Sequence, residues 1–193
     1  MRTFLTTALI GVVLSACTRG PGVADDTTAM DSAGATAAPA STGTATATLR
    51  DASGRELGTL TLTDTVGGIV VSGRLSGLAP GEHGLHLHMT GSCEPPAFAS
   101  AGPHWNPTSA QHGAQNPQGP HRGDMPNVSA GPDSSAVVQA LTPGGSLRGA
   151  ADMLLDADAA AVILHASGDD YRTDPSGGSG SPIACGVVTD TGR

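Results

Sequence analysis

The sequence predicts an all-β protein, and three observations support this fold class. Short apolar runs recur along most of the chain, Gly, Pro, Asp and Ser fill nearly every gap between them, and no segment sustains the 3.6-residue period of an amphipathic helix. Regular short strands separated by turns are typical of an antiparallel β-sandwich or barrel. The length of 193 residues fits one domain with a tail.

Eight segments are expected to form strands. Small and polar residues alternate over Ala45–Leu49, and the same habit over Leu57–Thr65 places Leu60 and Leu62 on one face. Since only 2% of the residues are aromatic, the core must consist of Val, Ile, Leu and Ala. The other predicted strands are Ile69–Leu75, Leu85–Met89, Ala136–Leu141, Ala151–Leu155, Ala161–His165 and Ile183–Val188.

The stretch from Thr90 to Ser135 interrupts this pattern. It consists mainly of Gly, Pro, Ser, Asn and Gln, and a loop of such length inside a compact domain is either disordered or functional. It carries His104, His112, His121, Asp124 and Cys93, so metal ligands and a disulfide could order it. A second loop, Ala166–Pro182, is shorter and acidic at its start.

The charge balance argues against a nucleic-acid partner. The formal net charge is −8, and the nine basic residues, all arginines, are scattered along the chain. Binding to phosphates needs clustered Lys and Arg.

The N-terminus is expected to be a targeting segment. A short positive region precedes an apolar stretch, Phe4–Leu14, that is too short to span a membrane. Leu14-Ser15-Ala16-Cys17 resembles the lipobox of bacterial lipoproteins, which predicts a signal peptide over 1–16 and lipidation of Cys17. The alternative is an ordinary secretory signal. Residues 17–43 have no hydrophobic period and are predicted to be a flexible tether before the domain at 44–193.

Export bears on the two remaining cysteines, Cys93 and Cys185. In an oxidising compartment they form an even pair that could close a disulfide. A bridge across so long a loop would stabilise the fold by about 4–5 kcal/mol in the chain-entropy model. The alternative is a thiolate metal site, which two cysteines without a CxxC spacing support poorly.

Six of the seven histidines form a pattern that indicates metal sites. His86 and His88, two apart on a strand, project to the same face, although such a pair alone is as often solvent-facing. His165 ends an apolar strand, where a buried hydrogen-bonded histidine is the alternative. In the long loop, three imidazoles and a carboxylate make a tetrahedral zinc set that no core explains; the alternative is a flexible loop. This set is His104, His112, His121 and Asp124.

Several motifs, in order and with family-like spacing, resemble copper–zinc superoxide dismutase. The resemblance covers about 44–190, and the Gly123–Asn127 motif is similar to the bacterial periplasmic branch. It implies a Greek-key, immunoglobulin-like sandwich with long metal-binding loops. The motifs are Gly84-Leu85-His86-Leu87-His88, Ala101-Gly102-Pro103-His104-Trp105-Asn106-Pro107, His112-Gly113, His121-Arg122-Gly123-Asp124 and Ala184-Cys185-Gly186-Val187-Val188.

The resemblance assigns roles to individual residues. Copper would be held by His86, His88, His104 and His165, and zinc by His104, His112, His121 and Asp124, so that His104 bridges the two metals. Asp169 would accept hydrogen bonds from a copper-ligand and a zinc-ligand histidine. His83 would be structural, and Cys93 and Cys185 would form the family's intrasubunit disulfide.

One departure concerns the copper channel. The family normally carries an arginine three residues before the second disulfide cysteine, and this chain has Pro182 there. A guanidinium attracts and anchors an anion, and proline does neither. We therefore expect slower superoxide capture with a weak or altered salt dependence, unless Arg122 or Arg172 reaches the channel.

The sequence thus predicts an exported, lipid-anchored copper–zinc superoxide dismutase of the bacterial cell envelope, facing the periplasm. Its substrate would be superoxide, its membrane contact the lipid on Cys17, and its assembly a monomer or a homodimer. The main alternative is a non-catalytic lipoprotein of the same fold that stores or delivers copper or zinc. A copper-only relative is a weaker alternative because His112, His121 and Asp124 are all present.

Overall fold

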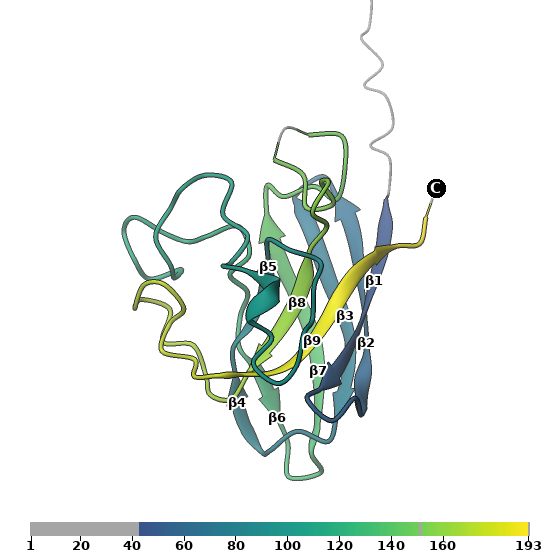
Figure 1. Cartoon of the computed structure of the whole chain (residues 1–193). Helices are drawn as coiled ribbons and strands as arrows, with labels where there is room; N and C mark the ends of the chain where they lie inside the picture. The colour runs from purple at the N-terminus through teal and green to yellow at the C-terminus, as the bar shows by residue number, and fades with distance from the viewer. Residues whose placement is uncertain (1–42, 151, 193) are drawn as a thin grey trace, which may run out of the picture. The chain divides into compact units, whose positions relative to one another are not determined.

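A computed structural model describes residues 43–150 and 152–192, and within these the chain forms strands and one short 3₁₀ helix (Figure 1). The 3₁₀ helix, η1, spans Ala99–Ala101. The described ranges contain no helix long and apolar enough to cross a membrane. The strands are β1 (Thr44–Asp51), β2 (Glu56–Thr65), β3 (Gly68–Ser76), β4 (Gly81–His83), β5 (Leu85–His88), β6 (Val128–Ala130), β7 (Ser135–Pro143), β8 (Ala161–His165) and β9 (Pro182–Asp190).

Seven of these strands form one curled antiparallel sheet in the order β5-β8-β9-β1-β2-β3-β7, and β4 pairs with β6 separately. The sheet order departs from the sequence order because β8 and β9 return to lie between β5 and β1. The all-β prediction is therefore confirmed. Two long connections, β5 to β6 and β8 to β9, lie side by side beyond β5 and β8 (Figure 1).

Alternation along the strands explains the core. In β1 the inward residues Ala45, Ala47 and Leu49 are fully buried, while the threonines between them are half-buried. Strand β8 is buried at every position because Val162 and Leu164 pack into the main core while its other face meets the smaller cluster around the disulfide. The core is mainly aliphatic, as the composition predicts, but it also buries two of the chain's few aromatic residues, Trp105 and Phe98.

One predicted strand is wrong. Met153 forms only an isolated bridge with Ser146, and the amides of Leu154 and Leu155 donate to the carbonyl oxygens of Ser146 and Leu147. Leu154 and Leu147 are both buried. The apolar residues predicted to form a strand over Ala151–Leu155 are therefore explained by burial in a local turn, because this segment does not pair with the sheet. Strands β4 and β6, at three residues each, were not predicted, since they are too short to show a period.

The predicted disulfide joins Cys93 to Cys185, with 5.6 Å between their Cα atoms. It attaches the connection after β5 to the last strand. The signal peptide predicted over 1–16, the lipidation of Cys17 and the tether up to residue 42 lie outside the described residues.

Candidate metal centre

Pairing of β5 with β8 assembles the first group of histidines. His86 and His88 project together from β5, and His165 ends β8, where its amide donates to the carbonyl oxygen of Gly84 at 2.9 Å. His104 joins them through an isolated bridge with His88. One ring nitrogen from each of these four buried residues lies within 4.8 Å of the other three. We call His86, His88, His104 and His165 the copper group.

Among the described residues, each histidine of the copper group has one ring nitrogen that faces an oxygen atom and one that has no hydrogen-bond partner. The fixed nitrogens face Asp169 Oδ2 at 2.9 Å, the carbonyl oxygen of Gly102 at 2.7 Å, Asp124 Oδ1 at 2.9 Å and the carbonyl oxygen of Gly180 at 2.9 Å. A buried nitrogen without a partner is costly, and four that converge fit one metal ion that prefers imidazole. These four are His86 Nδ1, His88 Nε2, His104 Nε2 and His165 Nε2.

A second group forms around one carboxylate oxygen, Asp124 Oδ1. The Nδ1 atoms of His104, His112 and His121 lie 2.9, 3.1 and 3.2 Å from it, and those of His104 and His121 are 3.4 Å apart. Four ligands about 2.0–2.1 Å from a tetrahedral zinc ion are separated by about 3.3 Å. The spacing therefore fits zinc. We call His104, His112, His121 and Asp124 the zinc group.

His104 belongs to both groups because its Nδ1 faces Asp124 while its Nε2 is one of the four convergent nitrogens of the copper group. The two groups are close enough that a ligand atom of His86 also lies within 4.8 Å of those of His104, His112 and Asp124. The predicted ligands are thus brought together, with one imidazole between the two groups.

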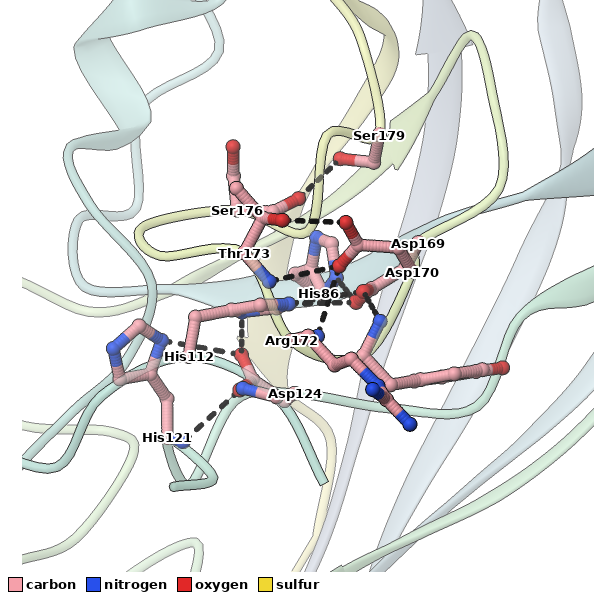
Figure 2. A network of polar contacts seen from close by, with 12 residues as sticks. His86, His112, His121, Asp124, Asp169, Asp170, Arg172, Thr173, Ser176 and Ser179 are labelled. Carbon is pink, nitrogen blue, oxygen red and sulfur yellow. Dashed lines mark hydrogen bonds and ion pairs between the residues drawn. The ribbon is translucent and has the colours of Figure 1, made fainter. Parts of the chain in front are cut away.

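Asp169 joins the two groups from the other side (Figure 2). Its Oδ2 lies 2.9 Å from His86 Nε2 and its Oδ1 lies 3.0 Å from His112 Nε2. Each of these histidines turns its other nitrogen, Nδ1, toward its own group. The predicted contact of Asp169 with a histidine from each group is therefore present. A carboxylate in this position fixes both rings and their tautomers.

The electrostatics of the two groups differ. Burial lowers the pKa of His86 to about 4 and that of His88 to about 3, and it also lowers the pKa of His165. Burial acts in the same direction on His112, but hydrogen bonds with Asp124 and Asp169 outweigh it and raise its pKa to about 9. For both carboxylates, burial is outweighed by hydrogen bonds from histidines, so the pKa of each is lowered.

Two residues beside the copper group, His83 and Pro182, can be compared with their predicted roles. The ring nitrogens of His83 lie 2.8 and 2.9 Å from the carbonyl oxygens of His165 and Ala79, which agrees with a structural role. Pro182 is the register partner of His165 at the start of β9.

The two arginines considered as substitutes for the missing channel cation are engaged elsewhere. Arg122 donates to the carbonyl oxygen of Pro143 at 2.6 Å and lies 3.5 Å from Asp152, and Arg172 donates to Gln115 at 2.9 Å. Over the described ranges, neither side chain forms a hydrogen bond or ion pair with a residue of the copper group.

Three residues of the centre were not predicted. Asn127 and Tyr171 hold Asp169 in place, and Gly177 allows the backbone to pass beside its carboxylate. Asn127 closes the Gly123–Asn127 motif, which was the one available signal.

Comparisons with known proteins agree with this geometry. A family model described as copper/zinc superoxide dismutase (SODC) matches residues 56–188. A protein of Caulobacter vibrioides named superoxide dismutase [Cu-Zn] is 40% identical over 147 residues, which are 75% of this chain and 84% of the relative.

Two solved structures share the fold. A SOD-like protein from Bacillus subtilis superposes with a TM-score of 0.71 at 36% identity, over 74% of this chain and 96% of that one. A Cu/Zn superoxide dismutase from Brucella abortus superposes with a TM-score of 0.61 at 30% identity, over 75% and 98%.

Proposed function

Because the chain belongs to the copper/zinc superoxide dismutase family, we propose that it converts superoxide to oxygen and hydrogen peroxide at a copper–zinc centre bridged by His104. The observation that carries this proposal is the set of four convergent nitrogens that have no hydrogen-bond partner within residues 43–150 and 152–192, one of which belongs to a ring that also contacts the zinc group. A ring shared in this way serves a two-metal centre better than two independent sites.

The metal would supply one-electron chemistry. His86, His88, His104 and His165 would hold copper, which would supply the one-electron redox chemistry that dismutation of superoxide requires. In total, two superoxide ions and two protons give one O₂ and one H₂O₂. The zinc group fixes the ring of His104 through its Nδ1.

The protein's own part includes a proton at His104 Nε2. This nitrogen has no hydrogen-bond partner in the part of the chain that the structure describes, while Nδ1 of the same ring lies 2.9 Å from Asp124 Oδ1. Whenever Nε2 is not acting as a ligand it can hold one proton and donate it to the peroxide product, and solvent supplies the second proton. Asp169 holds the rings of His86 and His112 in the orientation that both states require.

The rival function is metal storage or delivery without dismutation. Two observations favour it: a solved relative described only as SOD-like, and Pro182 in the place of a channel cation. Against it, a carrier needs neither a shared imidazole nor a carboxylate that spans both groups. We expect dismutation with weakened electrostatic guidance.

Activity of the metal-loaded protein separates the two functions. The protein with copper and zinc contents verified by elemental analysis should dismute superoxide, and His165→Ala should lose that activity while keeping its zinc. His83→Ala serves as a control, because it perturbs the same region without removing a ligand. A wild-type protein that holds both metals and does not dismute superoxide would be a carrier.

We also propose that the protein is attached to the cell envelope through a lipid on Cys17. A disulfide between Cys93 and Cys185 persists in an oxidising compartment, which supports export. Mass spectrometry of the mature N-terminus should find a diacylglyceryl cysteine at position 17, and Cys17→Ser should release the protein from membranes. A mature N-terminus that begins at another residue and carries no lipid would contradict the proposed anchor.

A further inference from the structure

We propose that Asn127 is a positioning residue that fixes Asp169 and thereby couples the copper group to the zinc group. Asn127 lies three residues after Asp124 and directly before β6, and its side chain lies against the β8–β9 connection. Its Nδ2 donates to the carbonyl oxygen of Asp169 at 2.9 Å, and its Oδ1 accepts from the amide of Asp169 at 2.8 Å. Both backbone polar groups of Asp169 are thus held by one side chain.

Tyr171 completes this clamp. The amide of Asn127 donates to the Tyr171 hydroxyl at 2.8 Å, and the amide of Tyr171 donates to Asp169 Oδ1 at 2.6 Å. Tyr171 has a φ of 62°, a conformation that is uncommon for residues other than glycine. Such backbone conformations persist where the surrounding contacts over-determine them. Asn127, Tyr171 and Asp169 therefore form a closed ring of hydrogen bonds.

The clamp affects both groups because it holds Asp169, which contacts a histidine of each group. Its two carboxylate oxygens face the Nε2 atoms of His86 and His112, whose Nδ1 atoms point into the two groups. An imidazole is rigid, so a displacement of Asp169 tilts both rings and moves both Nδ1 atoms. Loss of the clamp should therefore change the two groups together, although the side chain of Asn127 hydrogen-bonds to the backbone of Asp169 and to neither of these rings.

The chain offers a matched control for this role. In the same connection after β5, Asn106 makes the same pair of contacts with another residue: its Nδ2 donates to the carbonyl oxygen of Ala110 at 2.8 Å, and its Oδ1 accepts from the amide of Ala110 at 3.0 Å. Both asparagines are half-buried. Asn106→Ala removes an equivalent pair of hydrogen bonds from the loop and leaves Asp169 untouched.

The test rests on the two-metal centre and not on dismutation. Protein loaded with Cu(II) and with Co(II) in the zinc group reports on each group separately, through the copper EPR hyperfine coupling and the cobalt visible spectrum. Asn127→Ala should change both spectra and lower zinc retention against a chelator by about tenfold, near the lower end of the range for outer partners of metal ligands. Asn127→Asp keeps the acceptor but sets a carboxylate oxygen against the carbonyl oxygen of Asp169, so it should also change both spectra.

The outcomes separate a positioning role from general support of the loop. Asn106→Ala should lower thermal stability and keep both spectra as in the wild type. Unchanged spectra in Asn127→Ala, a change in only one group, or the same change in Asn106→Ala would overturn the coupling. If Asn127→Ala does not fold, Asn127→Asp decides. A wild type that binds only one metal refutes the premise, whereas one that binds both and lacks dismutase activity refutes the proposed function alone.

Discussion

The copper group and the zinc group share His104 but are built by different parts of the fold. Strands β5 and β8 supply His86, His88 and His165, so the sheet itself sets their separation. The other three zinc-group residues, His112, His121 and Asp124, come from the single connection between β5 and β6. The sheet ladder orders the first group, and a carboxylate orders the second.

This difference predicts different states before metal binds. Among the described residues, the convergent copper-group nitrogens have no hydrogen-bond partner, and burial keeps the rings of His86 and His88 neutral, so these two rings can ligate an ion without releasing a proton. The zinc-group nitrogens already contact Asp124. The first group is arranged by the fold without metal, whereas the second needs charge, from a proton or an ion, to hold its loop.

Removal of both metals should give the largest effect and should fall unevenly on the two groups. Amide hydrogen exchange should become much faster over residues 104–124. The amides of β5 and β8 should stay protected, because the sheet does not depend on metal. Binding of a structural zinc ion contributes about 10 kcal/mol or more to small zinc domains, so a fall of many degrees in Tm is expected. Hydrogen-exchange mass spectrometry and calorimetry measure both quantities. Equal loss of protection in β5, β8 and the loop would refute the contrast.

Gly177→Ala should displace Asp169, the residue that contacts one histidine in each group. A Cβ at this position would collide with Asp169 Oδ1 and approach His112 Nε2 at 2.7 Å, and Gly177 has a φ of +66°. We expect a loss of about 10–100-fold in metal affinity, since the outer carboxylate is displaced. Competition with a chelator gives the affinity.

Gly149→Ala is the control for Gly177→Ala. Gly149 has a φ of +78°, and a Cβ added there would meet no atom of the described residues within 4 Å. The substitution should cost similar backbone strain and leave metal affinity unchanged. Equal affinity losses in the two variants would show that strain, and not Asp169, is responsible.

The metal ligands could be predicted from the sequence more easily than the residues that hold them in place. His86 and His88 follow the two-residue period of a strand, and the zinc-group histidines stood out in a loop with no core to explain them. Asn127 and Tyr171 gave no comparable signal, because their roles arise only where two connections about 40 residues apart meet. The strand predicted over Ala151–Leu155 was wrong because an apolar run indicates burial and not strand pairing. Strands β4 and β6 were missed because three residues are too few to show a two-residue period.

Pro182→Arg should change the copper group alone. Pro182 pairs with His165, so a guanidinium there would stand beside the copper group, where no arginine contact is found among the described residues. We expect kcat/KM for superoxide to rise by about tenfold at low salt and to fall as ionic strength increases. Pulse radiolysis over a salt series measures this, with Pro182→Gln as the uncharged control. A wild-type rate that already falls steeply with salt would show that another cation guides the anion.

The smallest effect expected is a difference in how the two groups respond to pH. In the metal-free protein the pKa of His112 is raised to about 9, so zinc must displace a proton there, and zinc affinity should increase about tenfold per pH unit between pH 7 and 9. His86 and His88, with pKa values lowered to about 4 and 3, release no proton in that range, so these two rings add nothing to the pH dependence of copper binding.

The same shifts govern the stability of the metal-free fold. The contribution of His112 is complete below its unfolded pKa of about 6.5 and is lost as the pH rises toward 9. His86 and His88 act in the opposite sense, because the unfolded chain takes up their protons first, so stability falls from pH 6.5 toward 4. Urea unfolding from pH 4 to 9 should therefore give a maximum near pH 6.5, and His112→Gln should remove only the alkaline decline. A decline that survives in that variant would assign it to groups outside the zinc group.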